Sequence, residues 1–184
     1  MHNKRNIKQA IAGATYLQAL FIVFLVSLSM TAYAQRKLEI EQSDVLRFDQ
    51  RNGKNVQKII GNVRLRQETT LFYCDSAILN NSSNTLYAYG DVHINYNDSV
   101  DVYGRYLEYD GDTRIATLDS NARMVDSRMT LTSDKLIYNR ASRWAYYDSG
   151  GMIEDEENVL TSVIGRYYTN TKELFFRDSV VLTN

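Results

Sequence analysis

The sequence contains no proline and only one cysteine, one tryptophan and two histidines among its 184 residues. Without proline, no residue lacks the N–H that a ladder of backbone hydrogen bonds needs, so long unbroken strands are allowed. Cys74 has no partner cysteine, which excludes an internal disulfide, and we interpret it as a small strand residue. His93 is the only histidine after His2, and a lone histidine without cysteine partners is a poor zinc site.

The signatures of the common enzyme classes are also missing. The sequence has no Gly-x-Ser-x-Gly elbow, no glycine-rich phosphate loop followed by lysine and no His-Glu-x-x-His. Acidic residues cluster at 110–112 and 154–157, but neither cluster has the ligand spacing of a calcium loop, and we predict a hairpin turn and a solvated loop. We therefore expect no enzymatic activity, no cofactor and no bound metal.

Residues 1–34 have the pattern of a secretory signal peptide. Lys4, Arg5 and Lys8 precede an apolar run over residues 17–30, and Ala-Tyr-Ala at 32–34 offers a small-x-small cleavage site. The alternative is an uncleaved membrane anchor, but the apolar run is shorter than the ~20 residues that a spanning helix needs. We expect export to the periplasm and one domain over residues 35–184.

The charge of that domain limits its partners. Removing the three basic residues of the signal leaves 18 basic residues against 22 acidic ones, a formal net charge of −4. Nucleic acid is therefore not an expected partner. An anionic ligand would have to be held mainly through its apolar part, with help from local basic groups.

The domain repeats with a period of about thirty residues. The pentapeptide GNVRL at 61–65 recurs as GDVHI at 90–94 and as SNARM at 120–124, with weaker echoes at 150–153 and 178–182. Four residues align as equivalent positions of successive units: Leu86, Ile115, Trp144 and Leu174. A fixed period of this size indicates stacked supersecondary units that bury a shared core only together.

Within each unit the hydrophobic period is two, which is typical of strands with one face inward. Apolar Leu86, Ala88 and Val92 alternate with polar residues or tyrosines. The alternation fails over residues 103–109, where a bend or bulge would switch the faces. Turn-forming residues separate the predicted strands at 80–84, 97–98, 110–112, 139–142 and 170–172. We predict an all-β antiparallel fold, either a two-sheet jelly roll open at its ends or a flat β-solenoid.

The repeated motifs resemble those of the OstA/LptA family of periplasmic lipopolysaccharide-transport proteins. The matching elements are the Gly-[Asn/Asp]-Val-x-[Leu/Ile] strand, the Leu-x-Ala-x-Gly of residues 86–90 and the Asp-x-[Ala/Leu]-x-[Leu/Tyr] segments that begin at Asp75 and Asp134. The resemblance covers nearly all of residues 45–184. The chain departs from the pattern at Ser120 and Ala122, which replace the glycine and the valine in the third unit, and in its 14 tyrosines.

This resemblance implies a fold, a ligand and partners. The expected fold is a twisted, slotted β-jellyroll whose groove holds the lipid A acyl chains of lipopolysaccharide. The expected partners are further copies and the inner-membrane and outer-membrane components of lipopolysaccharide transport. Copies would pair head to tail through strands near 45–48 and 175–182. The sequence stops at Asn184 directly after a predicted strand, which favours a longer parent protein or an end that pairs with another copy.

The alternation and the resemblance together give two sets of site residues. The predicted lipid-binding groove residues are Val63, Leu65, Leu86, Ala88, Val92, Ile94, Ile115, Met124, Trp144, Val180 and Leu182. The predicted head-group residues, which alternate away from the apolar set, are Arg64, Arg66, Arg105, Lys135 and Arg166. The simpler interpretations are a dry sandwich core for the first set and a solvated face for the second.

Three functions remain open at this point. A lipid-transport bridge requires a groove that accepts acyl chains and copies that associate end to end. A structural or adhesive β-repeat requires only a sealed, dry core. A carbohydrate-active module requires paired carboxylates, and although Asp75 and Asp134 are both acidic, their equivalence in the repeat already explains them. The first of these is our functional hypothesis.

Overall fold

The computed structural model describes residues 37–49, 55–96 and 99–184. The chain divides into two units, Met1–Gln35 and Arg36–Asn184, and only the second is described below. The predicted signal peptide at 1–34 and the predicted turn at 97–98 lie outside the described residues. The part of the chain that is described contains strands and no helix, and so no helix able to cross a membrane.

Fourteen strands form one sheet in which every neighbouring pair is antiparallel. In chain order they are β1 (Glu39–Gln42), β2 (Val45–Asp49), β3 (Val56–Gln67), β4 (Thr70–Asn80), β5 (Thr85–Tyr96), β6 (Val100–Asp110), β7 (Ile115–Asp126), β8 (Thr130–Asn139), β9 (Trp144–Tyr147), β10 (Gly151–Glu154), β11 (Val159–Ser162), β12 (Ile164–Tyr168), β13 (Glu173–Arg177) and β14 (Val181–Thr183).

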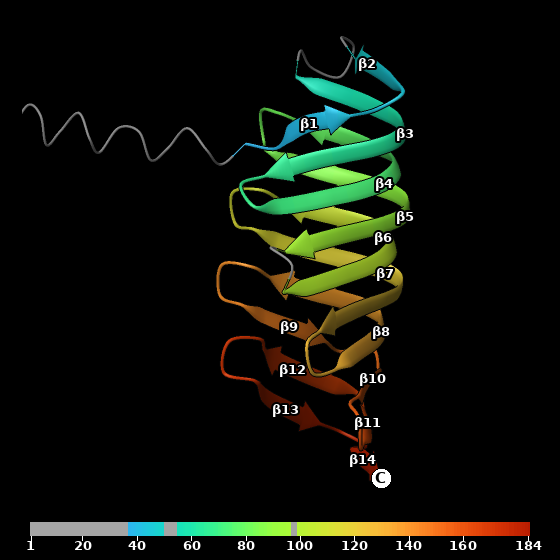
Figure 1. The fold of residues 1–184 in the computed structure, drawn as a ribbon, viewed down its shortest axis with the longest axis vertical. Coiled ribbons are helices and arrows are strands. Elements are labelled where there is room, and N and C mark those ends of the chain that lie inside the picture. Colours follow the sequence, from blue (N-terminus) through green and yellow to red (C-terminus); the bar gives the residue numbers. More distant parts are fainter. Residues whose placement is uncertain (1–36, 50–54, 97–98) are drawn as a thin grey trace, which may run out of the picture. The chain divides into compact units, whose positions relative to one another are not determined.

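The sheet folds over on itself into two facing layers. Each of the long strands β3 to β8 runs through one layer, bends midway and continues in the other, as Figure 1 shows at the side where these strands are labelled. Layer 1 includes β2, β9, β12 and β13, and layer 2 includes β1, β10, β11 and β14. This open, two-layer antiparallel arrangement confirms the predicted slotted jelly roll.

The bends occur where one strand carries an extra residue. Ile60 pairs with Ser76 and Val63 with Cys74, so two residues of β3 oppose Asp75 alone. The same irregularity recurs in β5 and β7. The residue pairs that form these bulges all have left-handed φ angles: Gly61 and Asn62, Gly90 and Asp91, and Ser120 and Asn121. A bulge of this kind kinks a strand, which is why each strand leaves one layer and enters the other.

Two sequence predictions about the bends can be compared with the structure. The predicted bend within residues 103–109 is confirmed, because the register of β6 against β7 shifts between Tyr103 and Tyr106. Gly90 has φ +71°, and a Cβ there would lie only 2.1 Å from Oδ2 of Asp75. Glycine at this bend is therefore favoured both by the backbone conformation and by the space that the neighbouring acid occupies.

The inward side chains of both layers form one hydrophobic core. Leu86, Ala88, Val92 and Ile94, which the alternation placed on one face, are all at most 2% exposed. The bend explains why a single strand serves both layers: Leu86 and Ala88 belong to layer 1, whereas Val92 and Ile94 belong to layer 2. The predicted period-two pattern is confirmed on both sides of the bend.

The predicted alignment of Leu86 with Ile115 and Trp144 is wrong. Leu86 pairs with Tyr109, which pairs with Ala116, so Ala116 lies in the row of Leu86. Through Tyr138 and Tyr167 the same row continues to Ala145 and to Leu174, whose predicted equivalence with Leu86 is confirmed. Ile115 and Trp144 each lie one position earlier and face outward. The cause is the spacing between bends, which is 30 residues from Gly90 to Ser120, while the alignment assumed 29.

Candidate functional site

The space between the layers is lined on one side by a continuous apolar track. Each strand of layer 2 contributes one of its inward residues to this track, and cross-strand pairing joins these residues into a row perpendicular to the strands. The track consists of Ile40, Leu65, Phe72, Ile94, Val102, Met124, Leu131, Ile153, Leu160 and Leu182. Ten strands at ~4.8 Å spacing give it a length of roughly 43 Å.

Layer 1 supplies the opposite wall with a row in which large and small side chains alternate. The register joins Leu86, Tyr109, Ala116, Tyr138, Ala145 and Tyr167. Tyr109 packs against Phe72 of the track with ring centroids 4.8 Å apart, and Tyr138 packs against Tyr96 of layer 2 at 4.7 Å. The layers are thus in direct contact, and tyrosines fill much of the space between them.

Most of the predicted groove residues line this interior. Seven face inward and are buried: Val63, Leu65, Leu86, Ala88, Val92, Ile94 and Met124. Ile115 and Trp144 instead lie half-buried on the outer face of layer 1, and Val180 and Leu182 lie exposed at the edge formed by β14. The role of these residues in lipid binding stays a prediction.

Three tyrosines of layer 1 reach across the interior to polar groups of layer 2. Tyr109 donates to Oε1 of Gln67 at 2.5 Å, and Tyr167 donates to Oδ2 of Asp126 at 2.5 Å. The hydroxyl of Tyr147 lies 2.7 Å from the hydroxyl of Ser162. Burial raises the pKa of all three tyrosines, so the hydroxyls stay protonated and able to donate. The high tyrosine content therefore has a structural use in joining the layers.

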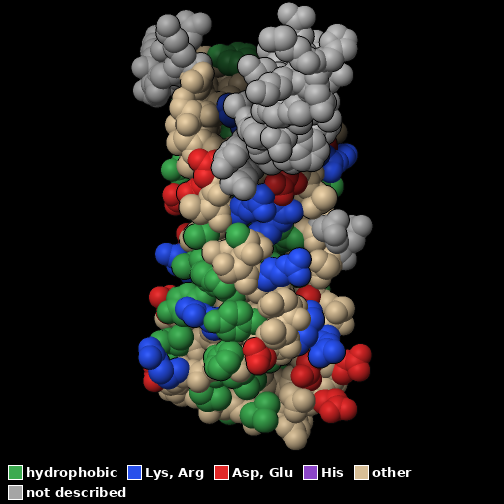
Figure 2. Space-filling model, turned by 90° about the vertical axis from the view of Figure 1, so that its left-hand side faces the viewer, with side chains coloured by type: hydrophobic (Ala, Val, Ile, Leu, Met, Phe, Trp, Pro, Cys, Tyr) green, Lys and Arg blue, Asp and Glu red, His purple; other side chains and the backbone are tan. Residues whose placement is uncertain are grey.

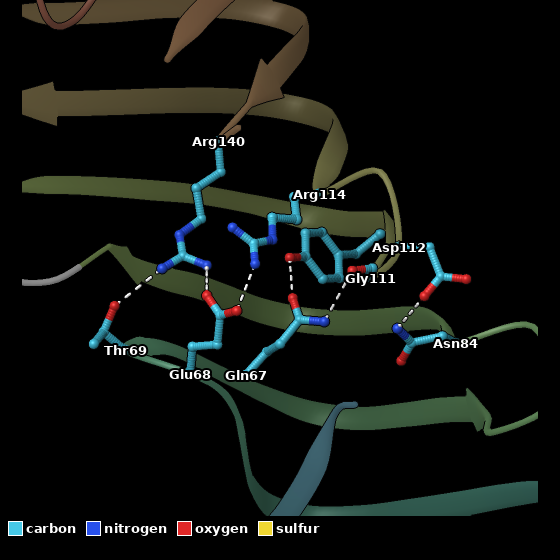
Figure 3. Close-up of polar contacts among 9 residues, drawn as sticks. Gln67, Glu68, Thr69, Asn84, Gly111, Asp112, Arg114 and Arg140 are labelled. Carbon is cyan, nitrogen blue, oxygen red and sulfur yellow. Dashed lines mark hydrogen bonds and ion pairs between the residues drawn. The ribbon is translucent and has the colours of Figure 1, made fainter. Parts of the chain in front are cut away.

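The slot mouth, the side opposite the bends where the turns of the two layers meet, is closed by ion pairs. Glu68 of layer 2 pairs with Arg114 at 2.5 Å and with Arg140 at 3.1 Å, both from turns of layer 1. Arg140 also donates to the hydroxyl of Thr69 at 3.0 Å. Figure 3 shows these side chains reaching toward one another across the mouth. Together they act as a latch between the layers.

A second closure lies nearer the C-terminal end. Lys172 of a layer 1 turn pairs with Asp126 of layer 2 at 2.7 Å. Burial is the largest influence on Asp126 and acts to raise its pKa, but hydrogen bonds from Lys172 and Tyr167 outweigh it. The net result is a lowered pKa, so Asp126 is ionised at neutral pH and holds the layers together electrostatically.

Gln67 completes the closure through the backbone of a turn. Its Nε2 donates to the carbonyl of Gly111 at 3.0 Å, while its Oε1 accepts from Tyr109. A Cβ on Gly111 would lie 2.8 Å from Nε2 of Gln67 and 2.6 Å from Nδ2 of Asn84. The absence of a side chain at Gly111 is what allows both amides to approach this turn.

The layer 1 turns stack into a column along the mouth. The last residues of the turns all have left-handed φ angles: Asn84, Arg114, Arg143 and Lys172. Backbone bonds connect successive turns, from Gly111 N to Asn84 O at 2.9 Å, from Arg140 N to Arg114 O at 3.1 Å and from Thr169 N to Arg143 O at 2.9 Å. Figure 2 shows basic side chains gathered along this face. The fold thus concentrates cations at the mouth of an acidic domain.

Sequence reasoning missed this column, although a signal for it exists. The four last-turn residues are spaced 30, 29 and 29 apart, the same spacing as the repeat. Three of the four are basic. The composition of the turns predicts their positions, but the alternation that identifies the head-group candidates applies only to strands and does not single out residues at turn ends.

A family model described as "OstA-like protein" matches residues 35–184. The chain belongs to the OstA-like family. It is also similar in fold to LptH of Pseudomonas aeruginosa, whose crystal structure is described as that of the LptA-homologous periplasmic component of the lipopolysaccharide transport device. That similarity has a TM-score of 0.51 and 12% sequence identity, and it covers 82% of this chain and 96% of LptH. A comparison with curated proteins returned no match.

The structure of this OstA-like domain does not bring the five predicted head-group residues together. Arg64 and Arg66 lie on the outer face of layer 2, where both pair with Glu41. Arg105 and Lys135 are exposed on β6 and β8, at or beside the bends. The fifth, Arg166, lies on the outer face of layer 1, its guanidinium 5.4 Å from the ring centroids of Trp144 and Tyr146. A head-group role for any of them stays a prediction.

The remaining chemistry of the described part is limited. Cys74 is a free, buried thiol whose pKa is raised by burial to about 12, so it is not a nucleophile at neutral pH. His93 is stacked between Tyr73 and Tyr103 on the outer face of layer 2 and lies 2.6 Å from Asp101. Within the described ranges, no three His, Cys, Asp or Glu side chains are grouped to hold a metal ion.

Proposed function

We propose that this chain is a periplasmic lipopolysaccharide-binding protein that holds acyl chains between its two layers and serves transport toward the outer membrane. Membership in the OstA-like family and the fold shared with the LptH transport component support this role. The observation that carries the proposal is the apolar track, which passes without interruption through all ten strands of layer 2 that pair in sequence. The role is non-enzymatic, because carriage needs no reacting group.

The track is long enough and apolar enough to account for binding without charge pairing. Its length of roughly 43 Å exceeds that of an extended acyl chain. Burying ten methylenes would contribute about 8 kcal/mol at ~0.8 kcal/mol each. Ordering the lipid and separating the layers would offset part of that gain. The net free energy of binding therefore depends on how easily the two layers separate.

The structure represents the closed form of the proposed carrier. The central residues of the track, from Leu65 to Leu131, are at most 1% exposed because layer 1 covers them. Lipid entry therefore requires separation of the layers at the slot mouth, where Glu68 and Asp126 hold the turns. The bends on the other side would act as the hinge, since there each strand is continuous between layers.

The two ends of the sheet offer surfaces for association. Phe48 on β2 and Leu182 on β14 face the interior side but are 63% and 59% exposed, because no described strand covers them. Pairing of the β1 and β2 edge of one copy with the β13 and β14 edge of another would cover both residues and extend the track. We propose the same edges for contacts with inner-membrane and outer-membrane transport components.

The proposed location is the periplasm. The pattern of residues 1–34 supports export and cleavage after Ala34, and the domain then begins with residue 35, where the family match also begins. Lipopolysaccharide must cross this compartment, so the ligand and the location agree.

Binding to lipopolysaccharide and to its deacylated saccharide tests the proposal. We expect saturable binding of the intact lipid only. Replacing Ile94, which faces inward, by Asp should abolish binding, whereas His93→Asp, one position away on the outer face, should leave it intact. Circular dichroism confirms that both variants are folded. Equal binding of the two ligands, or binding that Ile94→Asp does not alter, would contradict the proposal.

A structural or adhesive β-repeat is the second candidate, and the packed interior favours it. Side chains on both walls touch across the slot, as the Phe72–Tyr109 and Tyr96–Tyr138 contacts show. This function predicts a folded protein with no affinity for lipid. The same binding experiment therefore separates the two functions.

A further inference from the structure

A cavity of about 570 Å³ opens at the slot mouth between the turns of the two layers. Layer 2 contributes Thr69, Tyr96 and Ser99 to its lining, and layer 1 contributes Tyr138, Arg140, Arg143, Asn170 and Lys172 among others. The cavity thus has an aromatic part, formed by the Tyr96 and Tyr138 rings that are tilted against each other with centroids 4.7 Å apart, and a polar rim. It lies beside the proposed acyl-chain slot but does not use the apolar track.

The cavity carries a surplus of positive charge. Arg114, Arg140, Arg143 and Lys172 all line it. Glu68 neutralises one charge of the Arg114 and Arg140 pair, and Asp126 neutralises Lys172. Two positive charges remain from this group. This surplus is local, because the domain as a whole has a formal charge of −4.

Two groups at the cavity lack a partner within the part of the chain that is described. The Arg143 side chain is exposed, and no ion pair joins it to a described carboxylate. The hydroxyl of Tyr96 is buried and has no hydrogen-bond partner among the described residues. A buried hydroxyl without a partner destabilises the folded protein, so a ligand that supplies an acceptor there would remove that penalty.

From these features we infer that the cavity is a binding site for a phosphate monoester. A phosphate monoester carries close to two negative charges at neutral pH, which matches the surplus of two cations. Guanidinium groups bind phosphate oxygens through paired hydrogen bonds, and Arg143 and Arg140 come from the same turn. The volume accommodates a phosphate together with a sugar that bears it, and the Tyr96 hydroxyl can donate to the ester oxygens.

This inference rests on the proposed function only for the source of the phosphate. If the acyl chains occupy the slot, a phosphorylated head group would sit at its mouth, beside the cavity. A small soluble phosphate ester presents the same chemistry without a lipid. The experiment therefore uses both sources.

Calorimetric titration of the full chain with three probes tests the site. The probes are lipid A with its phosphates, the same lipid after phosphatase treatment, and glycerol 1-phosphate. We expect phosphatase treatment to weaken lipid binding about tenfold, equivalent to ~1.4 kcal/mol. Arg143→Gln should weaken binding of the phosphorylated lipid by about the same factor and leave the dephosphorylated lipid unaffected. Arg143→Lys, which keeps the positive charge, should lose less affinity for the phosphorylated lipid than Arg143→Gln.

The matched control is Arg105→Gln, since Arg105 is an exposed arginine at a bend, away from the mouth. Loss of affinity in Arg143→Gln but not in Arg105→Gln supports the site. Glycerol 1-phosphate binding that depends on Arg143, without any effect of phosphatase on lipid binding, assigns the site to soluble esters. Equal affinity of the two lipids, with no Arg143-dependent binding of glycerol 1-phosphate, overturns the inference while leaving acyl-chain carriage intact.

Discussion

At the scale of single residues, the bends depend on backbone conformations that few amino acids adopt easily. Gly61 and Gly90 provide left-handed φ angles without strain, and each also makes room for a neighbouring aspartate, Asp44 or Asp75. Ser120 adopts the same conformation with φ 67°, and the equivalent neighbour on β6 is Arg105. The third unit therefore keeps the bend but accepts strain at it.

This contrast predicts opposite effects of two substitutions on stability. Gly90→Ala should lower the free energy of unfolding by about 2 kcal/mol, because alanine is strained at φ +71° and its Cβ would meet Asp75. Ser120→Gly should raise it by about 0.5 kcal/mol, since relief of strain exceeds the entropy that glycine adds to the unfolded chain. Urea denaturation measures both. If both substitutions change the free energy of unfolding in the same direction, the left-handed backbone conformation at the bends does not determine the effect.

The lowered pKa of Asp126 predicts that the free energy of unfolding depends on pH. Its pKa in the folded state lies below the ordinary value of 3.8, so its stabilising contribution is fully present above pH 3.8 and is lost as pH falls through the folded pKa. Asp126→Asn should therefore cost about 1–3 kcal/mol near pH 7 and less near pH 3. Denaturation of both proteins at the two pH values measures the difference. If the difference in free energy of unfolding between the two proteins is as large in acid as at neutral pH, the predicted role of the Lys172 and Tyr167 contacts is contradicted.

At the scale of elements, the turns carry features that a search along strands does not reveal. The alternation of Leu86, Ala88, Val92 and Ile94 identified strands correctly because burial on one face imposes a period of two. That pattern cannot show which turns meet across the slot, because Glu68 and Arg140 are 72 residues apart. Contacts between layers depend on the bends, whose spacing varies between 29 and 30 residues.

The latch predicts a change in the rate of lipid uptake. Glu68→Gln removes the charge that holds Arg114 and Arg140, so the layers should separate more readily and lipopolysaccharide should associate about threefold faster, equivalent to ~0.65 kcal/mol. Stopped-flow fluorescence measures the rate. Glu108→Gln, an exposed substitution on the outer face of β6, is the control and should leave it unchanged. An unchanged rate in Glu68→Gln would show that lipid does not enter through the mouth.

At the scale of the whole domain, the repeat and the family motifs predict the architecture. Which residues line the candidate site depends on the pairing register between neighbouring strands. The Gly-[Asn/Asp]-Val pattern marks the bends of β3 and β5 in the structure. The position of the apolar track could not be predicted, since it requires knowing that Leu65, Phe72 and Ile94 pair across strands. One error in spacing, between Leu86 and Ile115, is enough to place both Ile115 and Trp144 on the wrong face.

The exposed ends predict association between copies. Phe48→Asp should weaken end-to-end association, because it places a charge where a second copy would cover the interior side of β2. Tyr89→Asp is the control, since Tyr89 is an exposed aromatic residue on β5, in the middle of the sheet and away from both ends. Sedimentation velocity over a range of concentrations measures the association. Equal behaviour of the two variants and the wild type would show that the ends do not pair in this way.

The most direct test of acyl-chain carriage uses the native methionines. Met124 lies in the apolar track and is fully buried, whereas Met152 on β10 faces outward and is 37% exposed. Replacing methionine by its diazirine analogue, loading the protein with lipopolysaccharide and irradiating it would mark the residues that touch acyl chains. We predict lipid adducts at Met124 and none at Met152 by peptide mass spectrometry. Adducts at Met152 alone, or at neither residue in a protein that binds lipid, would contradict carriage between the layers.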